Sequence, residues 1–357
     1  MNRVMIHPAS YGNLKEAVDR AFELFPVGLA GKKVLVKPNV LRSARPEEGI
    51  TTHPAVLEAV VKRVESQGPA SIVVGDNPGL HGYGANRECF EKTGLLDAAC
   101  GYYENIGDDP VAVQFNAEFM ETVSVSRAVL EADVIISLPK FKTHGLTVVT
   151  GAIKNSYGIM PGAVKARLHR AAGNPERFHQ AVVDVFAIRV PEMFIVDAVV
   201  SMEGNGPASP DLRDTGCIIA GSNAVAVDSV IARMMGLDPG RLGFLRYAEQ
   251  IGLGHWDPDS ISVDGKLEQI PDFKIPPLGG EAAADNQAVQ DLIRNRLSVK
   301  PRVDREICTG CATCAEQCPV SALVMNGEDD FPEVDKQTCI ACFCCQEVCP
   351  EKAIRLE

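Results

Sequence analysis

The chain has 357 residues, more than one hydrophobic core usually serves, and its 46% hydrophobic and 23% charged residues are typical of a soluble globular protein. No apolar run reaches the roughly 18–20 residues of a membrane helix, and the first residues lack the apolar core of a signal peptide, so we expect a cytoplasmic protein without membrane contact. A net charge of −12 argues against a nucleic-acid binder.

Apolar β-branched runs alternate with helical patterns through the first two thirds of the chain. Strands are predicted over residues 34–37, 71–75, 133–138, 193–199 and 217–220, and helices over 13–25, 54–67, 126–131, 177–188 and 224–235. In the second of these helices, Pro54 suits the first turn and Gly68 suits the end. This alternation predicts an α/β fold, with a mostly parallel sheet covered by helices in Rossmann-like layers.

Composition divides the chain into three parts. Residues 1–265 form the predicted α/β domain. Residues 266–299 are a linker, because 266–280 are rich in proline and glycine and a polar helix is expected near 281–297. Residues 300–357 hold nine of the twelve cysteines and form a small α+β domain of the bacterial ferredoxin type.

Polar residues follow the predicted strands where each strand ends. Ligands of such sheets gather beyond the carboxyl ends of the strands. The residues at these ends are Lys37, Asn39, Asp76, Asn77, Lys140, Lys142, His144 and Asn205. The segments around Asp76 and Asn205 are also ordinary turns by composition, but their shared placement after strands favours a ligand site.

A basic segment lies in the middle of this acidic chain. Between Ser137 and Gln180 there are seven lysines and arginines and one acid, Glu176. The segment indicates either an electropositive pocket for an anionic substrate or cofactor, or a docking face for the acidic C-terminal domain.

The chain lacks the usual short cofactor signatures. It has no G-x-x-x-x-G-K-[ST] phosphate loop and no complete dinucleotide fingerprint, and it lacks the H-E-x-x-H and G-x-S-x-G motifs. Flavin has no comparable signature, so the sequence neither supports nor opposes a bound flavin.

Two cysteine runs share the spacing C-x2-C-x2-C-x3-C-P, which is the bacterial spacing for a pair of [4Fe–4S] clusters. In that arrangement the fourth cysteine of each run binds the cluster of the other run. The first cluster is therefore assigned to Cys308, Cys311, Cys314 and Cys349, and the second to Cys339, Cys342, Cys345 and Cys318.

A zinc site is the main alternative, but it needs only four ligands, and eight cysteines in two matching runs favour clusters. Cys344 is a ninth cysteine inside the second run, and it is either a bystander or a residue that tunes the cluster or replaces a ligand. From Cys308 onward the net charge is −6, from three basic and nine acidic residues.

The chain resembles a known family along nearly its whole length. The segments are VLVKPNV (34–40), TTHP (51–54), VGDNPG (74–79), ADVIISLPKFKTHGLTVVTGAIKNSYG (132–158) and VDAVVSMEGNGP (196–207). They resemble the family of iron–sulfur-centre proteins in which a domain of unknown function (number 362) precedes a ferredoxin module. The resemblance implies an α/β core and a prokaryotic, often anaerobic, setting, but no particular reaction. It adds Lys154 and Asn155 to the candidate site.

The leading hypothesis is an oxidoreductase that passes low-potential electrons from two [4Fe–4S] clusters to a small anionic substrate in the α/β domain. Lys140 and Lys142 would bind or stabilise negative charge, and His144 would donate a proton. The candidate substrate-binding residues are Lys37, Asn39, Asp76, Asn77, Lys154, Asn155 and Asn205.

The alternative is an accessory protein that passes electrons, or an assembled cluster, to a partner enzyme through its acidic domain. Both hypotheses require a redox partner protein. The sequence leaves open the substrate, the direction of electron flow, the cluster potentials and the oligomeric state.

Overall fold

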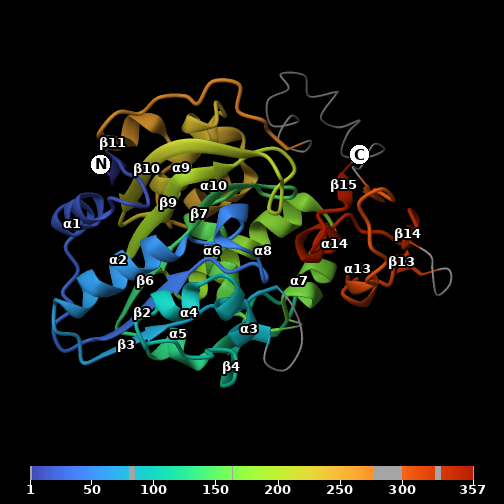
Figure 1. Ribbon diagram of the computed structural model, residues 1–357, viewed down its shortest axis with the longest axis horizontal. Coiled ribbons are helices and arrows are strands. Elements are labelled where there is room, and N and C mark those ends of the chain that lie inside the picture. The colour runs from blue at the N-terminus through green and yellow to red at the C-terminus, as the bar shows by residue number, and fades with distance from the viewer. Residues whose placement is uncertain (1, 80–84, 163, 277–299, 326–330, 357) are drawn as a thin grey trace.

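The computed structural model describes residues 2–79, 85–162, 164–276, 300–325 and 331–356. A nine-stranded sheet forms the centre of the α/β domain (Figure 1). Seven strands follow the order β11-β1-β10-β9-β6-β2-β3, while β7 pairs with β9 and β8 pairs with β7. The strands are β1 (Asn2–Pro8), β2 (Lys33–Pro38), β3 (Ser71–Val74), β6 (Val134–Leu138), β7 (Lys140–His144), β8 (Val148–Thr150), β9 (Met193–Met202), β10 (Leu212–Gly221) and β11 (Ile261–Asp264).

The sheet is mostly parallel, as the sequence predicts. Within the described residues, β2 runs parallel to β3 and β6, β9 runs parallel to β6 and β7, and β1 runs parallel to β11. The three antiparallel pairings are β1 with β10, β10 with β9, and β7 with β8. The central strands β2, β6 and β9 are buried along almost their whole length because helices cover both faces of the sheet.

Two apolar cores lie on the two sides of the sheet. One packs α1 (Lys15–Leu24), α2 (Pro54–Glu65), α3 (Ala85–Lys92) and α4 (Leu95–Ala98) against the strands. The other packs α6 (Ala152–Asn155), α8 (Pro175–Ile188), α9 (Ala224–Met234) and α10 (Gly243–Gln250). Two further helices are α5 (Arg127–Glu131) and α7 (Val164–Ala172), and a small hairpin joins β4 (Pro110–Gln114) to β5 (Thr122–Ser126).

One sequence-based expectation is wrong. Residues 140–144 were expected in a loop after a strand, but they form β7 and continue along the edge of β9. The break between β6 and β7 falls at Pro139, which has no N–H for the ladder, while its carbonyl accepts a 2.8 Å hydrogen bond from the N–H of Asp197. Residues i and i+2 of a regular strand share a face, but the register of β7 on β9 shifts between Lys140, which pairs with Asp197, and Lys142, which pairs with Met202. This irregularity lets Lys140 and Lys142 reach different environments.

The C-terminal module, residues 300–325 and 331–356, is built from two small antiparallel pairs and two short helices. The pairs join β12 (Pro301–Val303) to β15 (Ile354–Leu356) and β13 (Leu323–Val324) to β14 (Glu333–Val334). The helices are α13 (Thr313–Glu316) and α14 (Cys344–Val348). The helix expected near 281–297 lies outside the described residues.

The module packs directly on the α/β domain, with α14 on the side that faces the domain (Figure 1). Ala341, Phe343 and Leu356 belong to the same apolar core as α8 and α9. A Cβ added at Gly145 would lie 3.0 Å from side-chain atoms of Phe343 and Leu356, so the close approach of the two parts needs a glycine there. No helix among the described residues is long and apolar enough to cross a bilayer.

Candidate functional site

A cavity of about 70 Å³ lies where the ends of the parallel strands meet the C-terminal module. Its walls come from the segments after β2 and β3, from β7, β8, α6 and α7, and from the α14 segment of the module. The lining residues are Asn39, Val40, Leu41, Asp76, Asn77, Gly79, Lys142, His144, Thr150, Lys154, Asn155, Tyr157, Gly158, Lys165, Ala166, His169, Pro207, Gln317, Cys344, Glu347 and Val348. The sequence places its candidate site at the same strand ends.

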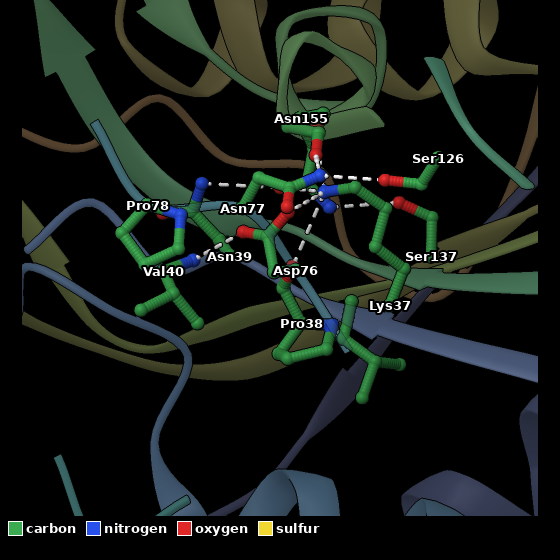
Figure 2. A network of polar contacts seen from close by, with 12 residues as sticks. Lys37, Pro38, Asn39, Val40, Asp76, Asn77, Pro78, Ser126, Ser137 and Asn155 are labelled. Atoms are coloured by element: carbon green, nitrogen blue, oxygen red, sulfur yellow. Dashed lines mark hydrogen bonds and ion pairs between the residues drawn. The ribbon is translucent and has the colours of Figure 1, made fainter. Parts of the chain in front are cut away.

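A buried ion pair supports one wall of the cavity. Lys37 Nζ lies 2.7 Å from Asp76 Oδ1 and donates a 2.7 Å hydrogen bond to the carbonyl of Asn155 (Figure 2). The other carboxylate oxygen of Asp76 accepts a 2.8 Å bond from the N–H of Val40. The pair needs Gly158 beside it, since a Cβ there would lie 2.1 Å from Asp76 Oδ1 and 2.8 Å from Lys37 Nζ.

The neighbouring asparagine side chains also form hydrogen bonds within the wall of the cavity. Asn155 Oδ1 accepts a 3.0 Å hydrogen bond from Asn39 Nδ2, and Asn155 Nδ2 donates a 2.9 Å hydrogen bond to Ser137 Oγ (Figure 2). Asn77 donates to Ser126 and to the carbonyl of Gly158, at 2.9 and 2.8 Å. Because these polar groups are satisfied by each other, Asp76, Asn77 and Asn155 hold the strand ends together rather than reach for a ligand.

Three lysines in the cavity lack a carboxylate partner among the described residues. Lys142 Nζ donates only to the carbonyl of Ile50, at 2.6 Å, and Lys165 Nζ donates to the carbonyls of Asn77 and Pro78. Lys154 Nζ lies over the rings of Tyr157 and Phe178, 4.7 and 5.7 Å from their centroids. These side chains give the cavity a strong positive field.

Burial makes these charges costly. It lowers the pKa of Lys142 to about 7, with the charge of Lys154 adding to the effect, and it lowers the pKa of Lys165 to about 8. The pKa of Lys154 is also lowered by burial, although Glu347 opposes the shift. An anion in the cavity would favour the charged form of all three lysines.

His144 connects the cavity to the C-terminal module. Its Nδ1 accepts hydrogen bonds from the N–H groups of Leu146 and Thr147, at 3.1 and 3.3 Å, so the proton of the neutral ring sits on Nε2. The Nε2–H group donates a 3.0 Å hydrogen bond to Glu347 Oε1. Burial lowers the pKa of His144 to about 4, so the ring is neutral at pH 7 and its single N–H is already used.

His169 has the opposite tautomer. Its Nδ1 lies 2.8 Å from the carbonyl of Lys165 and 3.1 Å from the hydroxyl of Tyr157. The Tyr157 hydroxyl donates to the same carbonyl at 3.0 Å, and the carbonyl can only accept, so Nδ1 carries the proton. Burial lowers the pKa of His169 to about 4, which leaves Nε2 as an unprotonated acceptor. This nitrogen is buried and has no hydrogen-bond partner among the described residues. Asn39 Oδ1 is a second buried acceptor without a partner.

The structure separates the predicted site residues into three groups. Those that line the cavity are Asn39, Asp76, Asn77, Lys142, His144, Lys154 and Asn155. Lys37 lies behind them, bonded to Asp76 and Asn155. Lys140 and Asn205 are not among the lining residues.

Lys140 instead belongs to a separate buried cluster. Its Nζ lies 2.8 Å from Asp197 Oδ2 and 2.9 Å from the hydroxyl of Tyr11. Asp197 also accepts a 2.9 Å bond from the N–H of His53. The expected partnership of Lys140 and Lys142 at one substrate is therefore not what the structure shows.

Among the lining residues that were not singled out from the sequence as site residues, three have a basic or carboxylate side chain. They are Lys165, His169 and Glu347. Lys165 and His169 lie in the basic segment 137–180, and this segment was the sequence signal that could have identified them. The contact of His144 with Glu347 also shows that the segment both lines a pocket and meets the acidic module.

The predicted cluster ligands converge within the module. Cys308, Cys311, Cys314 and Cys349 line one cavity, together with Pro350 and Ala353. For the second set, Cys345 lies within electrostatic range of Cys339, Cys342 and Cys318. The fourth cysteine of the first set thus comes from the second run, as the crossed assignment requires.

Backbone N–H groups point at the sulfurs in a repeated pattern. Cys308 Sγ and Cys339 Sγ each accept from the residue two positions later, Gly310 and Ala341, at 3.4 Å. Cys318 Sγ and Cys349 Sγ each accept from the residue four positions later, at 3.2 Å. Such donors stabilise thiolates, and the four-cysteine cradle therefore fits a [4Fe–4S] cluster.

Two family models match separate parts of the chain. Residues 34–233 match the domain of unknown function DUF362, and residues 300–350 match a 4Fe-4S dicluster domain. The thylakoid-associated protein sll1697 of Synechocystis sp. is 32% identical over 231 residues, which are 62% of this chain and 69% of that protein.

Two solved structures align with part of this chain. One is a Thermotoga maritima protein with 14% identity and a TM-score of 0.40, and the aligned part covers 68% of this chain and 59% of that one. The other is the lactate racemase apoprotein of Thermoanaerobacterium thermosaccharolyticum, with 12% identity, a TM-score of 0.43, and 66% and 57% coverage. This chain thus spans less than two thirds of either structure.

The sequence motifs, the α/β core and the cysteine module lead to one assignment. This chain belongs to the DUF362 family and is an iron–sulfur protein with a C-terminal 4Fe-4S dicluster domain.

Proposed function

We propose that this protein is an oxidoreductase that transfers electrons between two [4Fe–4S] clusters and a small anion held in the cavity. One observation carries the proposal: the cavity has lysines of the α/β domain on one side and Cys344, Glu347 and Val348 on the other. Cys344 and the cavity-lining Gln317 adjoin Cys345 and Cys318, which are both assigned to the second cluster. Tyr157 of the cavity also lies within electrostatic range of Cys342, a third ligand of that cluster. A bound anion would therefore lie close to the second cluster.

The cavity residues have distinct proposed roles. Lys154 and Lys165 bind the anion and stabilise negative charge that develops on it, because fixed cations act strongly in a site that excludes water. Lys142 donates a proton, since a pKa of about 7 suits transfer near neutral pH. His144 does not fit the donor role expected from the sequence, because its N–H is bonded to Glu347.

Two bound [4Fe–4S] clusters would each exchange one electron, which matches the two electrons and two protons consumed when a C=O or C=C bond is reduced. Cys311, which belongs to the first ligand set, is the one exposed cysteine among the eight assigned ligands. A redox partner protein would exchange electrons there, while the second set faces the cavity.

The test uses the intact protein, reduced anaerobically and freed of excess reductant. Glyoxylate, pyruvate and crotonate serve as probes, and the visible absorbance of the clusters reports their reoxidation. We expect at least one probe to reoxidise the clusters, and Lys154→Met to slow this reaction about a hundredfold. Lys15→Met is the matched control, because Lys15 is on the surface, with its side chain 89% exposed.

Iron and sulfide contents are measured on the same samples, so that lost clusters are not mistaken for lost reactivity. Equal reoxidation rates in wild type and Lys154→Met would contradict the proposal. Salt-sensitive reoxidation by a partner protein, with no response to any small anion, would instead favour an accessory electron-transfer protein.

A further inference from the structure

We propose that the anion bound in the cavity carries a hydroxyl group, which donates a hydrogen bond to Nε2 of His169 while the oxyanion lies on Lys142, Lys154 and Lys165. This inference rests on the proposed binding site but not on electron transfer. The ligand class is a small hydroxylated oxyanion, either a 2-hydroxycarboxylate or hydrogen phosphate.

His169 supplies the first argument. Its side chain is 5% exposed and lines the cavity, and Nε2 has no partner among the described residues. The proton on Nδ1 is fixed by the carbonyl of Lys165 at 2.8 Å, so Nε2 can only accept. A buried acceptor left without a donor destabilises the folded protein, and a ligand with a donor group removes that cost.

The charges around the cavity identify the kind of donor. Lys142, Lys154 and Lys165 face one carboxylate, Glu347, because Asp76 is already paired with Lys37. An ammonium group on the ligand would be repelled by this excess of cations. The donor that meets Nε2 is therefore a neutral hydroxyl, on a molecule whose other oxygens carry negative charge.

The size of the cavity limits the ligand. A group the size of a water molecule needs about 10–15 Å³ of cavity volume, so a cavity of about 70 Å³ admits a ligand of about five non-hydrogen atoms. Glycolate and hydrogen phosphate each have five non-hydrogen atoms.

Two matched pairs of probes test the inference by titration calorimetry on the intact, cluster-loaded protein. Glycolate and acetate differ by one hydroxyl. Hydrogen phosphate and sulfate have the same shape, but only hydrogen phosphate carries an O–H. We expect the hydroxylated member of at least one pair to bind about three- to tenfold tighter, which is the usual value of one hydrogen bond.

The variant His169→Phe should abolish this preference and leave the affinity for acetate or sulfate unchanged. Phe keeps the ring contact with Phe178, whose centroid lies 4.2 Å away. His169→Gln serves as the conservative variant, because its amide oxygen can accept, and it should retain part of the preference. His255→Phe is the control, since His255 lies outside the cavity and its side chain is 69% exposed.

A preference in the carboxylate pair alone identifies a 2-hydroxycarboxylate, and one in the phosphate pair alone identifies hydrogen phosphate. Equal affinities within both pairs for the wild-type protein would overturn the inference, as would a preference that persists in His169→Phe. Hydroxyl-selective binding without cluster reoxidation would refute only the proposed electron transfer.

Discussion

His144 Nε2 lies 3.0 Å from Glu347 Oε1, and this hydrogen bond joins the α/β domain to the segment that contains the cluster cysteines. Both residues also line the cavity. The same contact therefore positions the module and completes the wall that a bound anion would meet.

Removal of this carboxylate should loosen the junction. In Glu347→Ala the buried N–H of His144 loses its acceptor, and we expect the free energy of unfolding to fall by about 1–3 kcal/mol. Denaturant unfolding of the cluster-loaded protein measures the change. Glu316→Ala, at an exposed position of the same module, should change stability by less than about 0.5 kcal/mol. Equal losses in the two variants would show that the His144 bond does not stabilise the junction.

Gly158 tests the ion pair behind the cavity. A Cβ at this position would lie 2.1 Å from Asp76 Oδ1, so Gly158→Ala should force Lys37 and Asp76 apart. Disruption of a buried pair typically costs about 3–5 kcal/mol. Thermal and denaturant unfolding would show the loss. Gly28→Ala is the matched control, because an added Cβ there meets nothing within 4 Å, and it should be nearly neutral.

Glycolate affinity should fall as the pH rises above about 7. Lys142 and Lys165 have pKa values of about 7 and 8 in the free protein, and a bound anion raises them, so binding takes up protons. The two cavity histidines do not produce this trend, since His144 and His169 are already neutral above about pH 4. Calorimetric titrations between pH 6 and 9, where glycolate stays ionised, check the sign. A pH-independent affinity would mean that neither lysine meets the anion.

The crossed ligand sets predict an asymmetric effect of cysteine substitutions. Cys349→Ser lies in the second run but should impair the first cluster, because Cys349 lines the same cavity as Cys308, Cys311 and Cys314. Cys344→Ser should keep the full iron content, since Cys344 is surplus to the eight ligands. Iron analysis and electron paramagnetic resonance of the reduced proteins distinguish these outcomes. Loss of iron in Cys344→Ser would identify it as a ligand.

The order of the main elements follows from local patterns. The helix at 54–65 lies within the predicted range 54–67, between Pro54 and Gly68. The strands at 33–38, 71–74 and 193–202 contain their predicted apolar cores. The spacing of the cysteines likewise depends on neighbours in the chain. Such features can be predicted because short-range periodicity reflects which face of each element is buried.

The surroundings of Lys140 and Lys142 could not be predicted from local patterns in the same way. Both were expected in one loop, but β7 sends Lys140 to Asp197 and Lys142 to the cavity. The tautomers of His144 and His169 also depend on which carbonyl or N–H the folded chain brings to each ring.

Residue types and spacing were enough to fix the cluster module, the α/β layers and the basic character of the strand ends. The fold alone decided that the acidic module closes a cavity over three lysines, and that Nε2 of His169, which lines this cavity, has no partner among the described residues. These properties depend on contacts such as that between residues 144 and 347, which are far apart in the chain. Hydrogen bonding and burial depend on which atoms are in contact in the folded chain, and local sequence patterns do not specify these tertiary contacts.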